Sequence, residues 1–260
     1  ESMRILLIRH GDPDYINDCL TEKGRREASL LADLMEKETV KDFFVSPLGR
    51  ARETASYTLK RLKRTAEEKD WLREFPAKLE VEDSVWLQKA YPDTRKEDGR
   101  FQTRIVWDML PAFWKEDPAY QTPEGWRNTE VAAHSNLNQA YGRVAAGIDD
   151  LLERYGYSRE GHLYRTEKGN RDTIACFCHF GVSCVILSHL WNVSPFVLWH
   201  SLAMAPTSVT ELYTEERQKG TAVFRASRIG DLSHLYAGRE PASFSARFCE
   251  TFDDPFQRHD

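Results

Sequence analysis

The chain has 260 residues, of which 41% are hydrophobic and 30% are charged. This length suits one large α/β domain or two small ones, and the apolar fraction is enough for a sizeable core. The net charge of -5 lacks the basic bias that usually accompanies nucleic-acid binding. No apolar run approaches the roughly 18 residues that a membrane helix needs. We therefore expect a soluble protein with neither nucleic acid nor a membrane as partner.

The cysteines and the N-terminal segment bear on the cellular compartment. An odd, scattered set of cysteines does not look like a disulfide framework. The N-terminal apolar run is too short for the hydrophobic region of a secretory signal. Both features predict a cytoplasmic protein. The five cysteines are Cys19, Cys176, Cys178, Cys184 and Cys249.

The apolar run at residues 5–8 ends abruptly in Arg9, His10 and Gly11. A short apolar run bounded by glycine is typical of a buried strand in a parallel sheet. In open α/β sheets, ligands bind just beyond the carboxyl ends of the strands. The sequence therefore predicts that a guanidinium, an imidazole and a flexible backbone lie at the strand end where a ligand would bind.

The next elements alternate between helix and strand. Thr21 is a typical helix N-cap, and apolar residues recur at helical spacing to about residue 38. A short strand at 43–45 is followed by a second helix from about Gly49. Residues 70–75 predict a third strand or its exit loop.

Residues 80–128 break this alternation and predict an insertion within a single domain that spans residues 1–260. We expect at least one helix in the insertion, near 102–116. The segment is either a small satellite core or a lid over the active site, and the two interpretations are compatible. Its aromatic residues are Trp86, Tyr91, Phe101, Trp107, Phe113, Trp114, Tyr120 and Trp126.

The last third of the chain returns to the α/β pattern. Apolar spacing predicts a long amphipathic helix over 129–154, and a polar loop over 157–171. A buried strand at 173–178 then ends in His179, and another helix follows it. Two final strands are expected, at 207–213 and 222–227, and then a loop-rich tail after about residue 235.

Two predicted strands thus end in the same way, with a histidine and then a glycine. His10 and His179 are 169 residues apart, and each alone would be weak evidence for catalysis. Arg50 adds a third feature, because it lies in the first turn of the helix after Ser46 and Pro47. An arginine beside the free backbone N–H groups of a helix start suits a phosphate.

Four ordered motifs and the strand that follows them together resemble the histidine phosphatase superfamily, the phosphoglycerate mutase-like group. The resemblance covers residues 4–64 and 172–230, and it implies a three-layer α/β/α fold with a mostly parallel central sheet. The matching segments are Arg9-His10-Gly11, Leu20-Thr21-Glu22-Lys23-Gly24, Ser46-Pro47-Leu48-Gly49-Arg50-Ala51 with Thr54-Ala55, Cys178-His179-Phe180-Gly181, and Thr207-Ser208-Val209-Thr210-Glu211-Leu212.

The resemblance implies a phosphohistidine mechanism on a small phosphorylated substrate. His10 would attack phosphorus and carry the phosphoryl group. Arg9, Arg50 and a protonated His179 would hold the phosphoryl oxygens, which makes a metal or other cofactor unnecessary. Gly11 would allow the backbone to approach these oxygens closely.

The leaving oxygen also needs a general acid. The family's acid often stands in an L-x-E segment, which matches Leu72, Arg73 and Glu74, so Glu74 is the expected acid. The alternative for Glu74 is a surface carboxylate paired with Arg73, and Glu80 and Glu82 are the reserves. The family's G-x-W-E-G and G-E-S segments are absent.

Three functions fit these residues. A phosphomonoester hydrolase is favoured over a mutase, because the loop between Gly11 and Leu20 has only eight residues. It lacks the longer Asn/Trp/Gly-containing segment of glycolytic mutases. A non-catalytic phospho-ligand binding protein is the third possibility, which the presence of His10, Arg9, Arg50 and His179 disfavours.

Overall fold

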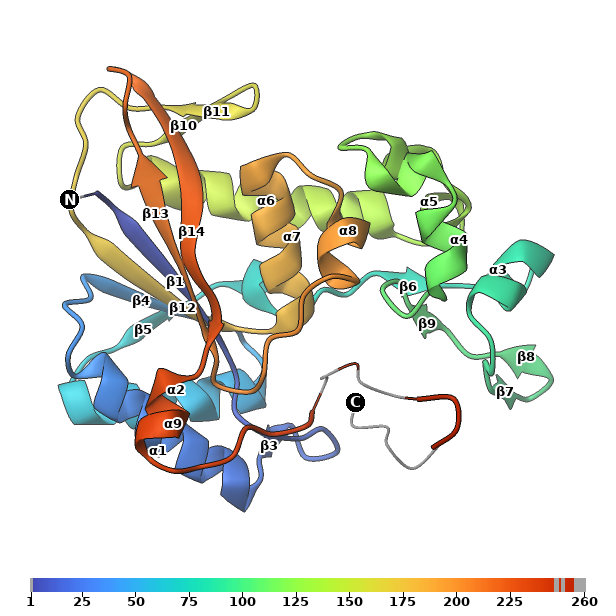
Figure 1. Cartoon of the computed structure of the whole chain (residues 1–260), viewed down its shortest axis with the longest axis horizontal. Coiled ribbons are helices and arrows are strands. Elements are labelled where there is room, and N and C mark those ends of the chain that lie inside the picture. Colours follow the sequence, from blue (N-terminus) through green and yellow to red (C-terminus); the bar gives the residue numbers. More distant parts are fainter. Residues whose placement is uncertain (1, 246–247, 249–250, 255–260) are drawn as a thin grey trace. The chain divides into compact units, whose positions relative to one another are not determined.

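The computed structural model describes residues 2–245, 248 and 251–254. The chain forms two compact units (Figure 1). The first consists of Glu1–Glu74, Leu151–Ser183 and Ala203–Asp260, and the second of Phe75–Asp150 and Cys184–Leu202. Helices α6 (Leu137–Glu153) and α7 (Phe180–Trp191) begin in one unit and end in the other.

The first unit is built on an eight-stranded sheet with the order β10-β11-β14-β13-β1-β12-β4-β5. Strands β1, β12, β4 and β5 are parallel, and the remaining neighbours are antiparallel. This mixed sheet with a parallel core, flanked by helices, confirms the expected α/β fold. The strands are β1 (Arg4–Arg9), β4 (Asp42–Val45), β5 (Ala66–Glu68), β10 (Ser158–Glu160), β11 (Leu163–Arg165), β12 (Thr173–Cys178), β13 (Val209–Glu215) and β14 (Thr221–Asp231).

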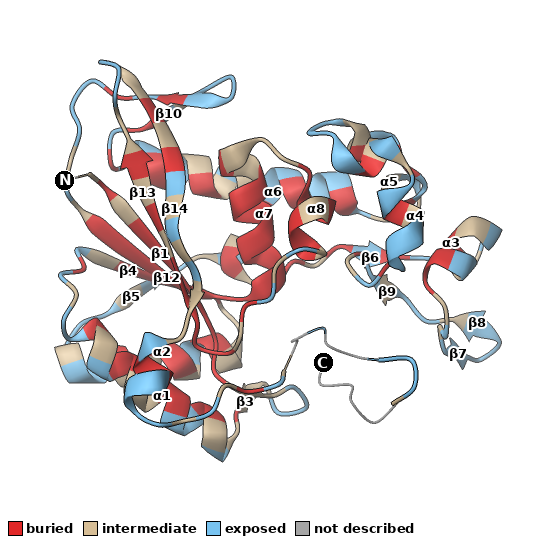
Figure 2. Ribbon diagram, viewed as in Figure 1, coloured by how far each residue is buried: buried red, intermediate tan, exposed pale blue. Residues whose placement is uncertain are grey.

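The core of this unit lies where β1 and β12 run side by side, and Figure 2 shows both strands as buried. Helices α1 (Glu22–Met35), α2 (Gly49–Leu62) and α9 (Ser233–Ala237) belong to the same unit. The Thr21 hydroxyl accepts a hydrogen bond from the Gly24 amide, which confirms the expected N-cap of α1. A short hairpin of β2 (Pro13–Asp14) and β3 (Cys19–Leu20) separates β1 from α1.

The second unit contains the whole aromatic segment 80–128. Trp86 packs against Phe113 and Tyr120, with ring centroids 5.4 and 6.2 Å apart, and Tyr120 in turn contacts Phe196. These contacts form the expected satellite core, whereas the lid stays a prediction. The elements are β6 (Lys78–Leu79), α3 (Val85–Ala90), β7 (Lys96–Glu97), β8 (Arg100–Phe101), β9 (Arg104–Ile105), α4 (Pro111–Lys115), α5 (Glu130–Ala133), α8 (Pro195–Trp199) and 3₁₀ turns at Pro118–Gln121 and Gly125–Asn128.

Two expected elements of the second unit are shorter than predicted. The helix near 102–116 is confined to α4, because residues 104–105 pair with β6 as β9. The long helix over 129–154 is broken into α5 and α6. At the break the Ser135 hydroxyl accepts the Leu137 amide and donates to the Val131 carbonyl, so it starts one helix and ends the other.

The first unit bears out one open alternative and differs from prediction elsewhere. The third strand is β5, and residues 70–72 form a 3₁₀ turn after it, so the exit-loop interpretation of 70–75 was right. The expected loop over 157–171 holds the β10–β11 hairpin, and α9 falls near the start of the expected tail. The strands β5, β10 and β11 are short and consist largely of charged side chains, so they lack the apolar alternation that predicts a strand.

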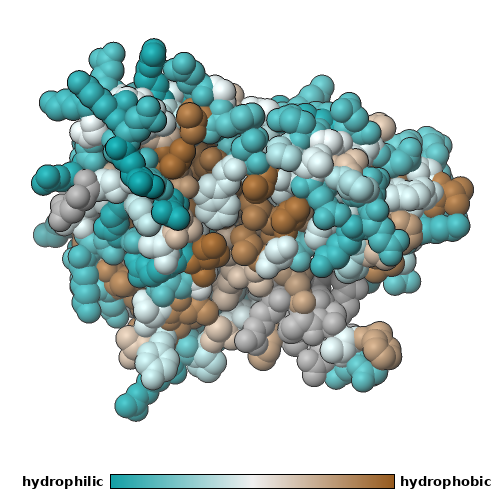
Figure 3. All heavy atoms as spheres, turned by 45° about the horizontal axis from the view of Figure 1, so that its top comes forward, coloured by the Kyte–Doolittle hydropathy of each residue, from teal (hydrophilic) through white to brown (hydrophobic). Residues whose placement is uncertain are grey.

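The face shown in Figure 3 is largely hydrophilic, in keeping with the 30% of charged residues. No helix among the described residues is both long and apolar enough to span a bilayer. Four cysteines are free thiols in the structure, and Cys249 lies outside the described residues. The free thiols are Cys19, Cys176, Cys178 and Cys184.

Candidate active site

The two histidines predicted at strand ends lie side by side. Arg9 and Cys178 are paired across the parallel strands β1 and β12, so the residues that follow them leave the sheet together. The ring centroids of His10 and His179 are 5.1 Å apart, and both side chains are almost fully buried. The parallel register therefore creates a pair of imidazoles at the carboxyl edge of the sheet.

The hydrogen bonding of His10 fixes its tautomer. Its Nδ1 lies 2.7 Å from the carbonyl oxygen of Gly11. A carbonyl can only accept, so Nδ1 carries the proton and the neutral ring has its lone pair on Nε2. Burial, followed by the charge of Arg9, holds the pKa of His10 well below its usual 6.5. The site thus keeps His10 neutral, which is the form of a nucleophile.

Arg9 is buried beside His10 and is held by backbone oxygens. Its Nη1 donates to the Met204 carbonyl at 2.7 Å and to the Ser245 carbonyl at 3.1 Å. Its Nε has no partner among the described residues and remains a donor that a ligand oxygen could use. These contacts pre-position a guanidinium at the strand end where an anion would meet it.

Arg50 is the second residue of α2, as predicted, and an unforeseen carboxylate orients it. Asp18 accepts the Arg50 Nη1 at 2.8 Å and also the amides of Gly49 and Arg50 at 2.6 and 3.2 Å. Arg50 also lies over the Tyr15 ring, 5.1 Å from its centroid. Asp18 therefore caps the helix and aligns the arginine at once.

Ser46 orients the second histidine. It follows β4, which is parallel to β12, and its hydroxyl lies 2.8 Å from His179 Nε2. The Nδ1 of His179 has no partner among the residues that the structure describes. Burial, followed by the proximity of His10 and the charge of Arg50, holds the pKa of His179 well below 6.5. The protein's own groups thus favour a neutral His179, whereas the resemblance implied a protonated His179 around a phosphoryl group.

Glu74 lies at the turn that follows His179. Its carboxylate oxygens accept the amides of Gly181 and Val182 at 3.2 and 3.0 Å, in the first turn of α7. Arg73 pairs with Asp70 at 2.6 Å. The half-buried Glu74 therefore accepts two backbone amides from residues just after His179. A surface carboxylate that only paired with Arg73, which was the alternative from the sequence, would not need these two hydrogen bonds.

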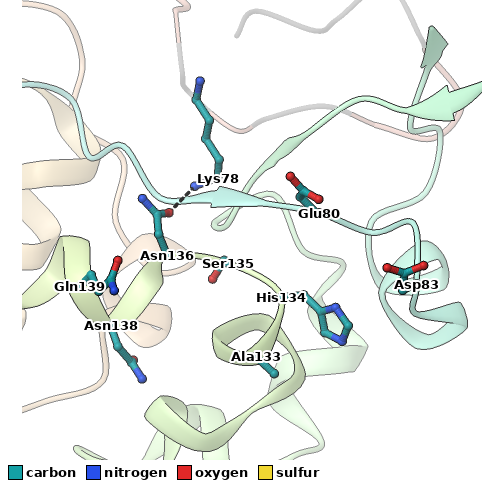
Figure 4. Close-up of a pocket in the computed structure, with 9 residues that line it drawn as sticks. All are labelled: Lys78, Glu80, Asp83, Ala133, His134, Ser135, Asn136, Asn138 and Gln139. Carbon is teal, nitrogen blue, oxygen red and sulfur yellow. Dashed lines mark hydrogen bonds between the residues drawn. The ribbon is translucent and has the colours of Figure 1, made fainter. Parts of the chain in front are cut away.

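The reserve carboxylates belong to the second unit. Glu82 accepts the Phe101 amide at 2.7 Å, which gives it a structural role in that unit. Glu80 lines a hollow of about 740 Å³ between the β6 segment and the junction of α5 and α6 (Figure 4). Asn136 closes one side of the hollow by accepting the Lys78 amide at 3.0 Å.

The backbone at Gly11 is crowded by the start of α1, whereas the expected approach of this backbone to phosphoryl oxygens stays a prediction. A Cβ at Gly11 would lie 2.9 Å from the Gly24 carbonyl oxygen, and one at Gly24 would lie 2.4 Å from the Asp12 carbonyl oxygen. The Gly11 amide donates to the Thr54 hydroxyl at 2.9 Å. The two glycines therefore allow the strand end, the start of α1 and α2 to approach one another.

Three residues that position the site were not assigned a role from the sequence: Ser46, Asp18 and Thr207. The Thr207 amide donates to the carbonyls of Arg9 and His10 at 3.1 and 3.0 Å. Ser46 and Thr207 carried a usable signal, because both stand in segments that match the family's motifs, whereas Asp18 stands in none. Among the described residues, no group of three His, Cys, Asp or Glu side chains is arranged to hold a metal.

Comparison with known proteins identifies a family. The model of the histidine phosphatase superfamily (branch 1) matches residues 5–226 of this chain. No curated protein matches the sequence significantly.

Solved structures share the fold at low sequence identity. A phosphoserine phosphatase mutant from Entamoeba histolytica in complex with phosphoserine has a TM-score of 0.53 at 16% identity, over 90% of this chain and 99% of its own. Bacillus stearothermophilus YhfR has a TM-score of 0.54 at 20% identity, over 90% of this chain and 100% of its own. A mycobacterial glucosyl-3-phosphoglycerate phosphatase has a TM-score of 0.54 at 17% identity, over 89% of this chain and 100% of its own. The fold is thus phosphoglycerate mutase-like, as the sequence motifs implied.

Proposed function

The chain belongs to the histidine phosphatase superfamily (branch 1), and from that membership we propose that it hydrolyses phosphate monoesters through a phosphohistidine on His10. Membership of this family makes the protein a phosphatase. The observation that carries the proposal is the bond from His10 Nδ1 to the Gly11 carbonyl, which leaves the Nε2 lone pair for phosphorus.

The surrounding groups suit a transferring phosphoryl group. Arg9 and Arg50 are positive, and the centroid of the His179 ring lies 5.1 Å from that of His10, so a protonated His179 would add a donor beside the phosphoryl group. In the transition state the charge spreads over the non-bridging oxygens, and fixed cations and donors stabilise it. A bound phosphate dianion would also favour protonation of His179, against the burial that lowers its pKa.

The reaction would take two displacements. In the first, His10 Nε2 forms a bond to phosphorus, the ester P–O bond breaks, and Glu74 gives a proton to the leaving oxygen. In the second, Glu74 removes a proton from water, the water oxygen attacks phosphorus, and the P–N bond breaks to release phosphate and His10. The hydrogen bonds from the backbone amides of Gly181 and Val182 would hold the Glu74 carboxyl close to His179 in the chain.

The first test compares p-nitrophenyl phosphate turnover by the wild type and His10→Ala between pH 5 and 8. We expect turnover to fall at least ~10³-fold in the variant, and a labelled phosphoenzyme to be trapped only with His10 present. Equal inactivity of both proteins, with no trapped phosphoenzyme, would leave a non-catalytic phospho-ligand binding protein as the better interpretation.

Glu74→Gln tests the acid. With a poor leaving group such as an alkyl phosphate we expect a large loss of turnover, and with p-nitrophenol little loss in the first displacement. An equal loss on both substrates would reject Glu74 and bring Glu80 and Glu82 back into consideration.

A small phosphorylated molecule is the proposed substrate class. Phosphoserine occupies one solved relative of the same fold, which supports this size range. Mutase activity remains the alternative, and it predicts phosphoryl transfer primed by a bisphosphate at rates comparable with hydrolysis. The short loop between Gly11 and Leu20 favours hydrolysis.

A further inference from the structure

Glu27 is a completely buried carboxyl group on α1, close to the nucleophile's own loop. None of its surface is exposed. Its Oε1 accepts the backbone amide of Asp12 at 2.7 Å, and its Oε2 has no partner among the described residues. A buried carboxylate with one unused oxygen is costly, so packing alone gives no reason for a charge here.

The Asp12 amide belongs to the same peptide group as the Gly11 carbonyl. That carbonyl accepts His10 Nδ1–H at 2.7 Å. The three groups therefore form one chain of hydrogen bonds, from the Glu27 carboxylate through a single peptide group to the imidazole. A negative charge that accepts the N–H of a peptide increases the electron density on its oxygen, and such chains strengthen cooperatively.

This inference rests on the proposed function. We propose that Glu27 is a positioning residue for His10, which fixes the Nδ1–H tautomer through the Gly11–Asp12 peptide group and makes Nε2 a better nucleophile. The carboxylate stabilises the positive charge that develops on the ring when the P–N bond forms, as the buried aspartate does in a Ser-His-Asp triad. Here a peptide group stands between the carboxylate and the ring.

The charged groups around Glu27 decide when it is ionised. Burial raises the pKa of Glu27 to about 7, with the Asp12 amide opposing the rise and the Asp12 carboxylate adding to it. Lys23, on the same helix, favours ionisation, and Glu240 from the C-terminal tail opposes it. Lys23 and Glu240 pair with each other at 2.9 Å, so they largely offset one another. The carboxylate form, and its effect on His10, would therefore be lost as the pH falls below 7.

The test is Glu27→Gln, because glutamine keeps the shape and an oxygen acceptor for Asp12 but removes the charge. The matched control is Glu22→Gln, an exposed carboxylate on the same helix. Rapid mixing with p-nitrophenyl phosphate gives the rate of His10 phosphorylation from pH 5 to 9. At pH 8 we expect a roughly tenfold slower burst in Glu27→Gln, with the substrate dissociation constant unchanged and with no change in the control variant. The difference should close at pH 5.5, where the wild-type carboxyl is also protonated.

A second readout does not depend on catalysis. The ¹⁵N chemical shifts of His10 report the tautomer and the strength of the Nδ1–H bond, and we expect the Nδ1 signal to move with pH near 7 in the wild type but not in Glu27→Gln. A phosphorylation rate that Glu27→Gln leaves unchanged at every pH would overturn the inference. If no protein forms a phosphoenzyme, the proposed function fails, and the Nδ1 signal alone decides. Movement of this signal with pH in the wild type but not in Glu27→Gln supports the hydrogen-bond chain, and the same behaviour in both proteins rejects it.

Discussion

His10 and His179 lie in contact because the residues before them, Arg9 and Cys178, are partners in neighbouring parallel strands. A shift of this register by one residue would turn one histidine to the other face of the sheet. Ser46 leaves the third parallel strand, β4, at the same edge and contacts His179. Three strand ends thus supply the proposed nucleophile His10, the proposed phosphate ligand His179 and the hydroxyl group that orients His179.

Ser46→Ala is expected to lower kcat/KM for p-nitrophenyl phosphate by roughly 10- to 100-fold, because His179 Nε2 loses the partner that fixes its ring. The protein should remain folded, since the removed hydroxyl is small. The control is Ser56→Ala, whose hydroxyl makes only a local bond to the Glu53 carbonyl in α2. Equal activity of Ser46→Ala and the wild type would show that ring packing alone holds His179.

Asp18→Ala is expected to lower the free energy of unfolding by about 1 kcal/mol at pH 7, because α2 loses its capping carboxylate. Burial raises the pKa of Asp18, but the Gly49 and Arg50 amides and the Arg50 guanidinium outweigh it, so the pKa lies below the usual 3.8. A carboxylate whose pKa is lowered in the folded chain stabilises the fold at pH values above 3.8. This contribution disappears as the pH falls through the pKa that Asp18 has in the folded chain. Urea titrations at pH 7 and pH 3 measure the difference. A similar loss in Asp150→Ala, an exposed carboxylate, would indicate a general charge effect instead.

Gly24→Ala is expected to destabilise the protein by roughly 1–3 kcal/mol and to impair phosphoryl transfer. The added methyl group would lie 2.4 Å from the Asp12 carbonyl oxygen and would push the Gly11–Asp12 backbone away from α1. Thermal denaturation and phosphoenzyme formation report the two effects separately. The matched control is Gly142→Ala in α6, where a Cβ meets nothing within 4 Å and should stabilise the helix by up to about 1 kcal/mol.

Much of the site could be predicted because its residues follow strong local signals. Buried apolar runs place His10 and His179 at strand ends, and a helix start after Pro47 places Arg50. Local patterns say nothing of partners distant in the sequence. Asp18 contacts Arg50 across 32 positions, and no periodicity or motif marks it.

The errors in the fold have a similar origin. The break between α5 and α6 occurs inside a continuous apolar pattern, and the Ser135 side chain, not the periodicity, decides it. The β10–β11 hairpin has short, polar strands whose pairing with β14 overrides their weak propensity. The burial of Glu27 could not be predicted from the sequence for the same reason. It occupies a helical position whose burial depends on how Asp12 folds back over α1.

The burial of Glu27 also predicts an unusual pH dependence of stability. The pKa of Glu27 is about 7 in the folded chain, against 4.5 for an ordinary glutamate. Between these values the folded state binds more protons than the unfolded state, so the free energy of unfolding falls as the pH rises. At about 1.4 kcal/mol for each pH unit, the carboxylate destabilises the fold by roughly 3 kcal/mol above pH 7.

Glu27→Gln should therefore be more stable than the wild type at pH 8, by up to roughly 3 kcal/mol, and similar to it at pH 5. Urea denaturation of both proteins at the two pH values gives the difference directly, with Glu22→Gln as the exposed control on the same helix. A gain that is equal at pH 5 and pH 8 would mean that shape and not ionisation distinguishes the two side chains. A gain confined to pH 8, together with slower phosphorylation of His10, would show a buried charge that weakens the fold and serves the nucleophile.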